Sequence, residues 1–271
     1  MPDLRLYPFE LPAGGNALFA RFPFIFEGRQ MPEISCALSL SAAGTMALDT
    51  GQPQNLSAAR RAFFDALKID GQNVYFARQT HSRNIVFSDE AYERFFDDTD
   101  GFVSGGGDDF LAVTVADCLP VLLYDTRGGA FAAVHSGWQG TGIAGDALRL
   151  MMERYGTKPE CVAVVLGPCI CGDCYEVDAE RAGLFERKFG GGAFADYPLG
   201  NVTLSKTAAG GETRRFIDLR AANAALLAAA GVRNIAYCVN CTFSDSRLGS
   251  YRREGAAYTK MLAVIGRLFP H

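Results

Sequence analysis

Three closely spaced apolar runs in the middle of the chain constrain its fold more than any other feature. They cover Phe110 to Val115, Pro120 to Tyr124 and Ala130 to Val134. Each run is nearly continuous, which is typical of strands that are buried on both faces. A fourth run, Cys161 to Leu166, stops at Gly167-Pro168. The chain therefore predicts a sheet that is covered on both sides.

Helical patterns separate these strands. Asn55 or Ser57 can cap a helix whose apolar stripe reaches Ile69, and Thr141 can cap a second helix that ends at Gly156. Because strands and helices alternate, the predicted fold class is α/β. The remaining expected elements are helices from Asp178 to Phe189 and from Asp218 to Ala230, a final helix over 257–268, short strands over 74–77, 84–87 and 235–239, and a loop over 190–213.

Length and composition indicate one globular domain. The 271 residues contain no repeats or low-complexity linkers, so we expect a single domain over residues 1–271. Hydrophobic residues make up 49% and charged residues 21%, and the net charge of −4 gives no electrostatic reason to expect nucleic acid or an anionic membrane as a partner. Because neither a targeting segment nor a run of membrane-helix length is visible, we expect a cytoplasmic protein. Its eight cysteines are then ligands, nucleophiles or buried thiols.

One cysteine and two histidines fall at the ends of the predicted buried strands. Cys118 follows Asp117 after the first run, His135 follows the third run, and His81 lies between two short strands. Two histidines and a cysteine are a three-ligand set for zinc that leaves a fourth position for water or substrate. Such an ion lowers the pKa of bound water to about 7. Asp117 would then carry protons or orient a ligand.

The residues alone leave three other interpretations open. Cys118 with His81 or His135 as base and Asp117 as orienting group would make a thiol-dependent hydrolase. The same two histidines and cysteine form the equatorial set of a blue-copper site, although two internal histidines are too few for a four-copper oxidase centre. A separate group of cysteines would bind structural zinc or an iron–sulfur cluster. Its members are Cys169, Cys171, Cys174, Cys238 and Cys241.

Two arginines follow a tyrosine near the C-terminal end of the chain. Arg252 and Arg253 come directly after Tyr251 in a polar segment. Guanidinium groups beside a tyrosine can bind an anion such as phosphate. A solvated turn is the alternative interpretation.

Several short motifs occur in one order along residues 79 to 255. The most specific are Ala116-Asp117-Cys118-Leu119-Pro120 and His135-Ser136-Gly137-Trp138. The others are Gln79-Thr80-His81-Ser82, Asp100-Gly101-Phe102, Gly167-Pro168-Cys169-Ile170, Cys174-Tyr175-Glu176-Val177, Asp218-Leu219, Cys241-Thr242 and Ser250-Tyr251-Arg252-Arg253. Together they resemble the bacterial laccase-domain proteins, also called the polyphenol oxidase or purine nucleoside phosphorylase family.

This resemblance implies a fold and a site. The fold would be a single-domain layered α/β sandwich related to the cysteine hydrolase-like fold of cytotoxic necrotizing factor. The site would hold a metal, zinc in most members, on His81, Cys118 and His135, with Cys118 and Asp117 at the catalytic centre. An anionic substrate also needs cationic partners, and we take Arg60 and Arg252 as candidates. Arg60 stands where members often have an Asn-Arg pair, although here alanine replaces the asparagine.

The resemblance also implies an activity. It would be zinc-dependent phosphorolysis of adenosine, inosine, guanosine and methylthioadenosine, together with deamination of adenosine. The expected partners are then small molecules, a purine nucleoside and phosphate, and the protein would be a monomer or a weak homo-oligomer. The alternatives are copper-dependent oxidation of phenols, hydrolytic editing of peptidoglycan precursors that carry a wrong amino acid, and purine binding without turnover.

Overall fold

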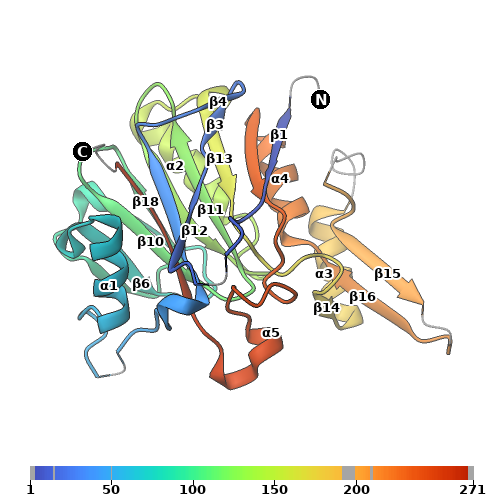
Figure 1. The fold of residues 1–271 in the computed structure, drawn as a ribbon. Coiled ribbons are helices and arrows are strands. Elements are labelled where there is room, and N and C mark those ends of the chain that lie inside the picture. The colour runs from blue at the N-terminus through green and yellow to red at the C-terminus, as the bar shows by residue number, and fades with distance from the viewer. Residues whose placement is uncertain (1–3, 15, 50, 191–198, 208–209, 268–271) are drawn as a thin grey trace.

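The computed structural model describes residues 4–14, 16–49, 51–190, 199–207 and 210–267. Two sheets pack face to face, and helices cover both outer faces (Figure 1). This arrangement confirms the predicted layered α/β class. Part of the predicted loop 190–213, and the histidine at position 271, lie outside the described residues. Within the described ranges, no helix is both long enough and apolar enough to cross a bilayer.

The larger sheet contains three of the four strands predicted from the apolar runs, whereas the first run forms β10 (Phe110–Val115) of the second sheet. The antiparallel centre of the larger sheet is β11 between β12 and β13, whereas β13, β17 and β1 are parallel, as are β9 and β7. The register places Pro120 opposite His135, so the start of β11 lies beside the end of β12. The strand order is β1 (Arg5–Phe9), β17 (Asn234–Cys238), β13 (Val162–Leu166), β11 (Leu119–Asp125), β12 (Phe131–Ser136), β9 (Gly101–Ser104) and β7 (Ile85–Phe87).

The second large sheet contains both N-terminal and C-terminal strands. Its order is β2 (Phe19–Phe22), β5 (Ser35–Ser39), β18 (Met261–Gly266), β10 (Phe110–Val115), β6 (Val74–Arg78) and β8 (Phe95–Asp97). A small sheet of β14 (Glu176–Val177), β16 (Thr213–Ile217) and β15 (Thr203–Thr207) extends away from the body (Figure 1). The strands β3 (Ile25–Phe26) and β4 (Arg29–Gln30) form a separate pair.

Alternating side chains divide the core into three parts. On β11, for example, Leu122 packs between the two large sheets, whereas Val121 and Leu123 face the helices. The helices α2 (Ile143–Tyr155) and α4 (Leu219–Ala229) pack on the larger sheet, whereas α3 (Ala179–Phe189) packs against the small sheet of β14, β16 and β15. The helix α1 (Ala58–Leu67) covers the second sheet, and the short helix α5 (Tyr251–Glu254) lies at one end of the sandwich. Both large sheets are thus buried on both faces, as the continuous apolar runs predict.

The structure corrects three local predictions. The segment predicted as a final helix over 257–268 contains β18, because its apolar run Met261–Gly266 fits a buried strand as well as a helix. The predicted loop 190–213 contains β15 and the first residue of β16. The N-cap of α2 is Gly142, and the hydroxyl of Thr141 instead donates to the carbonyl of Gly137. The predicted capping residues Ser57, Asp178 and Asp218 are confirmed.

Candidate metal centre and pocket

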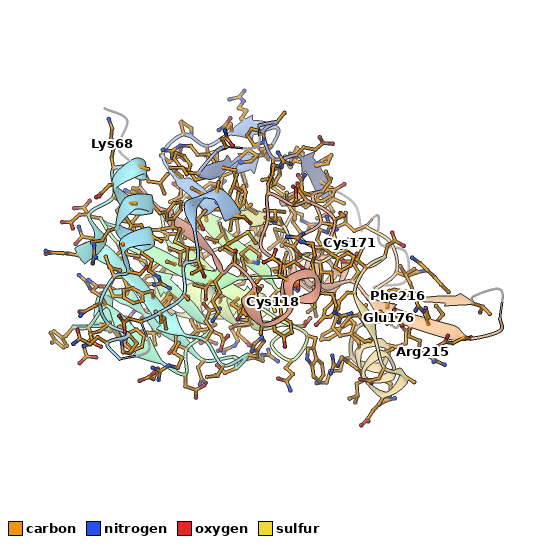
Figure 2. The ribbon with its side chains drawn as sticks, turned by 60° about the horizontal axis from the view of Figure 1, so that its bottom comes forward. Lys68, Cys118, Cys171, Glu176, Arg215 and Phe216 are labelled. Carbon is orange, nitrogen blue, oxygen red and sulfur yellow. The ribbon has the colours of Figure 1, made fainter. Side chains whose placement is uncertain are left out.

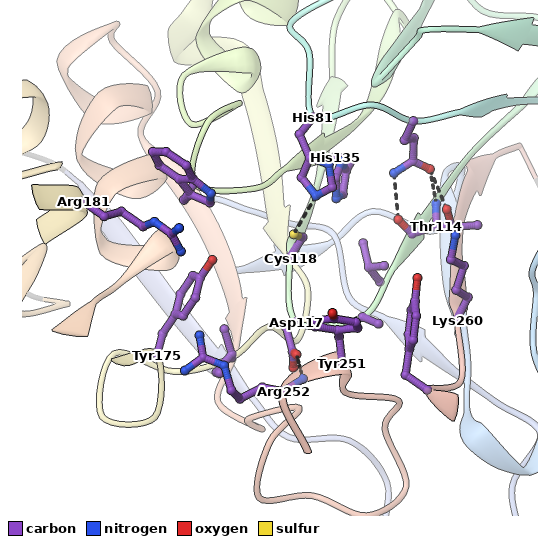
Figure 3. A pocket seen from close by; sticks show the side chains of 16 residues that line it. His81, Thr114, Asp117, Cys118, His135, Tyr175, Arg181, Tyr251, Arg252 and Lys260 are labelled. Carbon is purple, nitrogen blue, oxygen red and sulfur yellow. Dashed lines mark hydrogen bonds between the residues drawn. The ribbon is translucent and has the colours of Figure 1, made fainter. Parts of the chain in front are cut away.

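The chain brings His81, Cys118 and His135 together at one end of the space between the sheets. His81 follows β6, Cys118 precedes β11, and His135 lies on β12. One ligand atom from each lies within 4.8 Å of the others. The Cys118 Sγ is 3.8 Å from the His81 Nε2, and the two imidazole rings meet edge to face with centroids 4.9 Å apart (Figure 3). Nitrogen and sulfur donors at such separations fit a tetrahedral metal with one open position.

Asp100, which is fully buried, organises both histidines. Its Oδ1 accepts hydrogen bonds from the His135 Nδ1 at 2.7 Å and from the His81 backbone N–H at 3.1 Å. Its Oδ2 accepts from the backbone N–H groups of Thr80 and Ser82 and from the Ser82 hydroxyl. These bonds hold His81 at a φ of 63°, in the left-handed region. Because the Nδ1 of His135 is engaged, its Nε2 is left for a metal.

The electrostatics of the cluster favour a thiolate on Cys118. Burial alone would raise the pKa of this thiol, but the charge and hydrogen bonds of His135 and His81 lower it to about 6. Burial likewise opposes the charged form of His135, but Cys118 and Asp100 raise the pKa of His135 to about 9. The pKa of Asp100 falls to about 2, because the hydrogen bonds from His135 and Ser82 outweigh its burial. The thiolate is the form of cysteine that binds metals and attacks electrophiles.

Asp117 connects the metal cluster to the C-terminal segment. Its Oδ1 accepts a hydrogen bond of 2.6 Å from the Thr242 hydroxyl, and its Oδ2 accepts one of 2.7 Å from the backbone N–H of Arg252. Its backbone has a φ of 80°, an uncommon conformation for a residue with a side chain. Both carboxylate oxygens therefore stabilise the turn that presents Cys118. Of the two roles predicted for Asp117, proton carrier or orienting group, these bonds favour the second.

Gly137 gives the cluster its space. A Cβ atom at this position would lie 2.7 Å from the His81 Cδ2 and 3.2 Å from the Cys118 Sγ. Either contact would displace a candidate ligand. The His-Ser-Gly-Trp motif thus needs glycine because the His81 ring and the Cys118 sulfur lie against the backbone at this position, and not because the backbone must be flexible.

A pocket of about 390 Å³ opens over the cluster (Figure 3). Three cations line it together with four aromatic side chains. The guanidinium of Arg181 lies 4.5 Å from the ring of Trp138, and that of Arg252 lies 5.4 Å from the ring of Tyr175. The other lining groups of these kinds are Lys260, Tyr251 and Tyr258. Such a wall can accept a flat aromatic ring beside an anionic group.

Comparison with known proteins places the chain in a family. The model of the family described as multi-copper polyphenol oxidoreductase laccase matches residues 41–268. The chain belongs to this enzyme family. A purine nucleoside phosphorylase of Deinococcus radiodurans is 36% identical over 215 residues, which cover 79% of this chain and 78% of that protein. The adenosine deaminase RL5, from an unknown prokaryotic organism, is 33% identical over 209 residues, which cover 70% of this chain and 76% of that protein.

Two solved structures support the fold of this laccase-domain chain. A hypothetical protein YfiH of Bacillus licheniformis has a TM-score of 0.71 and 27% identity, and the match covers 86% of this chain and 92% of that one. YlmD of Geobacillus stearothermophilus has a TM-score of 0.75 at 23% identity, covering 98% of this chain and 99% of that one. The second likeness concerns the fold alone.

The structure does not bring Arg60 to the pocket of this laccase-domain protein. The Arg60 side chain is buried beside α1, where its Nε and Nη2 donate to the carbonyl of Met46 at 3.0 and 2.8 Å. Its guanidinium lies 4.9 Å from the ring of Phe76, and burial lowers its pKa to about 10. These contacts give Arg60 a structural role. Arg252, by contrast, lines the pocket, and its Nη1 donates to the carbonyl of Glu176.

Several pocket and supporting residues have no role in the sequence-based prediction. Asp100 lies in the quoted Asp100-Gly101-Phe102 motif, and its place beside a buried strand is a signal that could have identified it. Arg181, Tyr258 and Lys260 carry no such signal, because α3 and the segment before β18 are distant from Cys118 in the sequence.

Proposed function

We propose that this chain is a metal-dependent purine nucleoside enzyme that carries out phosphorolysis of purine nucleosides and deamination of adenosine. The observation that carries the proposal is the pocket itself, in which aromatic rings and three cations surround a His-Cys-His cluster. The names of the relatives, purine nucleoside phosphorylase and adenosine deaminase, suggest the substrate class. The three cations can form charge-assisted hydrogen bonds with a phosphate, and the aromatic rings can stack on a purine base.

His81, Cys118 and His135 would hold the metal, and we propose zinc. Two imidazoles and one thiolate suit zinc, although copper accepts the same donors. A metal bound here would activate water or polarise a substrate oxygen. Asp100 would fix the orientation of His135, and Asp117 would fix that of Cys118.

The chain's own residues then have distinct tasks. In phosphorolysis, a phosphate oxygen attacks C1′ of the ribose, and the bond from C1′ to the purine nitrogen breaks. Arg252, Arg181 and Lys260 would neutralise the phosphate, and Tyr175 or Trp138 would stack on the base. In deamination, the oxygen of water adds to C6 of adenine and ammonia leaves. Both reactions need the base held beside the cluster, where Cys118 and His135 lie.

Two other activities are compatible with parts of the site. The description of the matching family favours oxidation of phenols on copper. The Cys118 thiolate between two imidazoles favours a cysteine hydrolase, such as one that edits peptidoglycan precursors. We further propose that the enzyme acts in the cytoplasm as a monomer or weak homo-oligomer. The proposed thiolate at Cys118 requires a compartment that keeps cysteines reduced, as the cytoplasm does.

A chromatographic assay tests the proposal. Protein of measured zinc content is incubated with adenosine, with and without phosphate, beside the variants Cys118→Ala and Cys161→Ala. Adenine that appears only with phosphate indicates phosphorolysis, and inosine without phosphate indicates deamination. Both products should disappear with Cys118→Ala and persist with Cys161→Ala, which removes a buried thiol outside the pocket. Zinc-loaded protein that forms neither product would overturn the purine assignment, and turnover of a phenol only after copper loading would favour the oxidase.

A further inference from the structure

A second cluster of sulfur atoms lies outside the pocket. The Sγ atoms of Cys171, Cys174 and Cys241 are within 4.8 Å of one another. None of the three lines the pocket over Cys118. Figure 2 shows Cys171 apart from Cys118, on the side of the small sheet that contains Glu176 and Phe216. Cys169 and Cys238, which the sequence also suggested as members of such a group, do not belong to the cluster.

The cluster joins two segments that are distant in the sequence. Cys171 and Cys174 face each other across a tight turn, in which the carbonyl of Cys171 accepts from the N–H groups of Cys174 and Tyr175 at 2.9 Å each. Cys241 comes from the loop after β17. A parallel bridge between Cys169 and Cys241 holds the two segments side by side. A Cys-x-x-Cys turn closed by one remote cysteine is a common way to present thiolates to zinc.

The backbone around Cys241 is arranged for a negatively charged sulfur. The N–H of Cys171 donates to the Cys241 Sγ at 3.2 Å, and the N–H groups of Phe243 and Ser244 point to the same atom. A sulfur that accepts backbone N–H groups in this way is suited to bind a metal as a thiolate.

A buried cation lies close to these sulfur atoms. Arg220 on α4 donates to the carbonyl of Cys238, and its positive charge interacts with the sulfurs of Cys169 and Cys171. Three thiolates and one divalent ion carry a net charge of −1, and this guanidinium, which also interacts with Asp218, would offset part of the negative charge. A divalent ion bound here would take these sulfurs as thiolates and release the protons that they carry.

We propose that Cys171, Cys174 and Cys241 form a second metal site, a three-thiolate site for zinc that leaves a fourth position for water or an external ligand. Sulfur atoms bound to one tetrahedral zinc lie about 3.8 Å apart, given Zn–S distances of about 2.3 Å. The observed cluster, with its sulfur atoms within 4.8 Å of one another, is compatible with this geometry. A disulfide would join only two of the three sulfurs, so it would not account for the third member of the cluster.

The site would stabilise one wall of the pocket. Ile170 and Tyr175, which flank the Cys171–Cys174 turn, both line the pocket. Thr242, which follows Cys241, donates to Asp117 next to Cys118. An ion bound by the three cysteines would thus hold the Tyr175 segment and the Asp117 support in fixed positions. We assign it a positioning role and no contact with substrate.

Metal stoichiometry tests the proposal without relying on any enzymatic activity. The full chain is prepared under reducing conditions, equilibrated with zinc, freed of loosely bound metal and analysed by native mass spectrometry and elemental analysis. We expect about two zinc ions per chain in the wild type, about one in Cys118→Ser, about one in Cys174→Ser and none in the double variant. Cys161→Ser, which replaces a buried cysteine outside both clusters, should keep both ions.

Cobalt distinguishes the two sites even where a variant folds poorly. Thiolate-to-cobalt charge-transfer absorption grows with the number of thiolate ligands. Cys118→Ser should therefore retain most of the wild-type absorption when titrated with Co²⁺, and Cys174→Ser should lose most of it. A single zinc ion per chain that disappears in Cys118→Ser and persists in Cys174→Ser would overturn the proposal. A disulfide among Cys171, Cys174 and Cys241 in reduced, zinc-equilibrated protein would also overturn it.

Discussion

The Nδ1 of His135 donates to the Oδ1 of Asp100 over 2.7 Å, and both side chains are almost completely buried. The same carboxylate accepts three backbone N–H groups from residues 80–82. The Asp100 side chain thus fixes two candidate metal ligands, His81 after β6 of the second sheet and His135 on β12 of the larger sheet. We therefore expect metal binding at this candidate site to depend on Asp100 as well as on the three ligands.

Replacing Asp100 should weaken metal binding more than any surface change. In Asp100→Asn the amide has only one acceptor oxygen. It cannot accept the hydrogen bonds both from His135 and from all the backbone N–H groups of residues 80–82. We expect zinc affinity to fall by about 10- to 100-fold. The free energy of unfolding should fall by about 3–5 kcal/mol, because buried charge-assisted bonds are lost. Competition with a chromophoric chelator and denaturant unfolding measure the two effects.

Asp97→Asn is the matched control for Asp100→Asn. Asp97 is exposed and pairs with Arg78 on the surface. Its replacement should leave zinc affinity unchanged and alter stability by about 0.5 kcal/mol or less. Equal effects of the two substitutions on zinc affinity would show that Asp100 does not support the ligands.

The close contacts of Gly137 with His81 and Cys118 indicate that a side chain at this position would weaken metal binding while the protein still folds. In Gly137→Ala the new methyl group meets the His81 ring and the Cys118 sulfur, so one ligand must move. We expect zinc affinity to fall at least about tenfold, or about 1.4 kcal/mol. Gly145→Ala on α2 is the control, because open space surrounds a Cβ there. That variant should bind zinc normally and be more stable by about 0.5–1 kcal/mol. Normal zinc binding by Gly137→Ala would contradict the assigned ligand set.

The sequence pointed to His81, Cys118 and His135 as one candidate ligand set among several, because the chain has only two internal histidines. The resemblance to the laccase-domain proteins selected this set, and the structure brings the three side chains together. The continuous apolar runs predicted strands that are buried on both faces, and the family resemblance implied that they form a layered sandwich. The strand β18 was not predicted, because six apolar residues fit either a buried strand or a helix until their neighbours are known. The approach of Arg181 to Trp138 depends on long-range packing that no local pattern in the sequence encodes.

Acid should remove the stabilising effect of Asp245. Two hydrogen bonds from the Arg247 side chain, at 2.9 and 2.6 Å, hold the pKa of this carboxyl below its usual value in spite of partial burial. A lowered folded-state pKa stabilises the protein above the unfolded-state pKa, about 3.9, and this contribution is lost as the pH falls through the folded-state value. Asp245→Asn should therefore be less stable than the wild type at neutral pH, and the difference should shrink below about pH 4. Unfolding curves at several pH values measure it, and a difference that stays constant would contradict the linkage.

Replacing Arg60 and replacing Arg252, the two arginines predicted from the sequence to bind an anionic substrate, should have different effects on the KM for phosphate. The Arg252 side chain lines the pocket, whereas its backbone N–H supports Asp117. Arg252→Gln should therefore raise the KM for phosphate by about 10- to 100-fold, because one charge-assisted hydrogen bond to phosphate is lost. Asp117 should keep its position, because the substitution leaves the backbone N–H of residue 252 unchanged.

Arg60→Met should leave the KM for phosphate unchanged. It should lower the free energy of unfolding by about 1–3 kcal/mol, because the carbonyl of Met46 loses a buried donor. Phosphate-dependent release of adenine gives the KM, with Arg149→Gln on the exposed face of α2 as the control. A raised KM in Arg60→Met, or an unchanged one in Arg252→Gln, would contradict this division of roles.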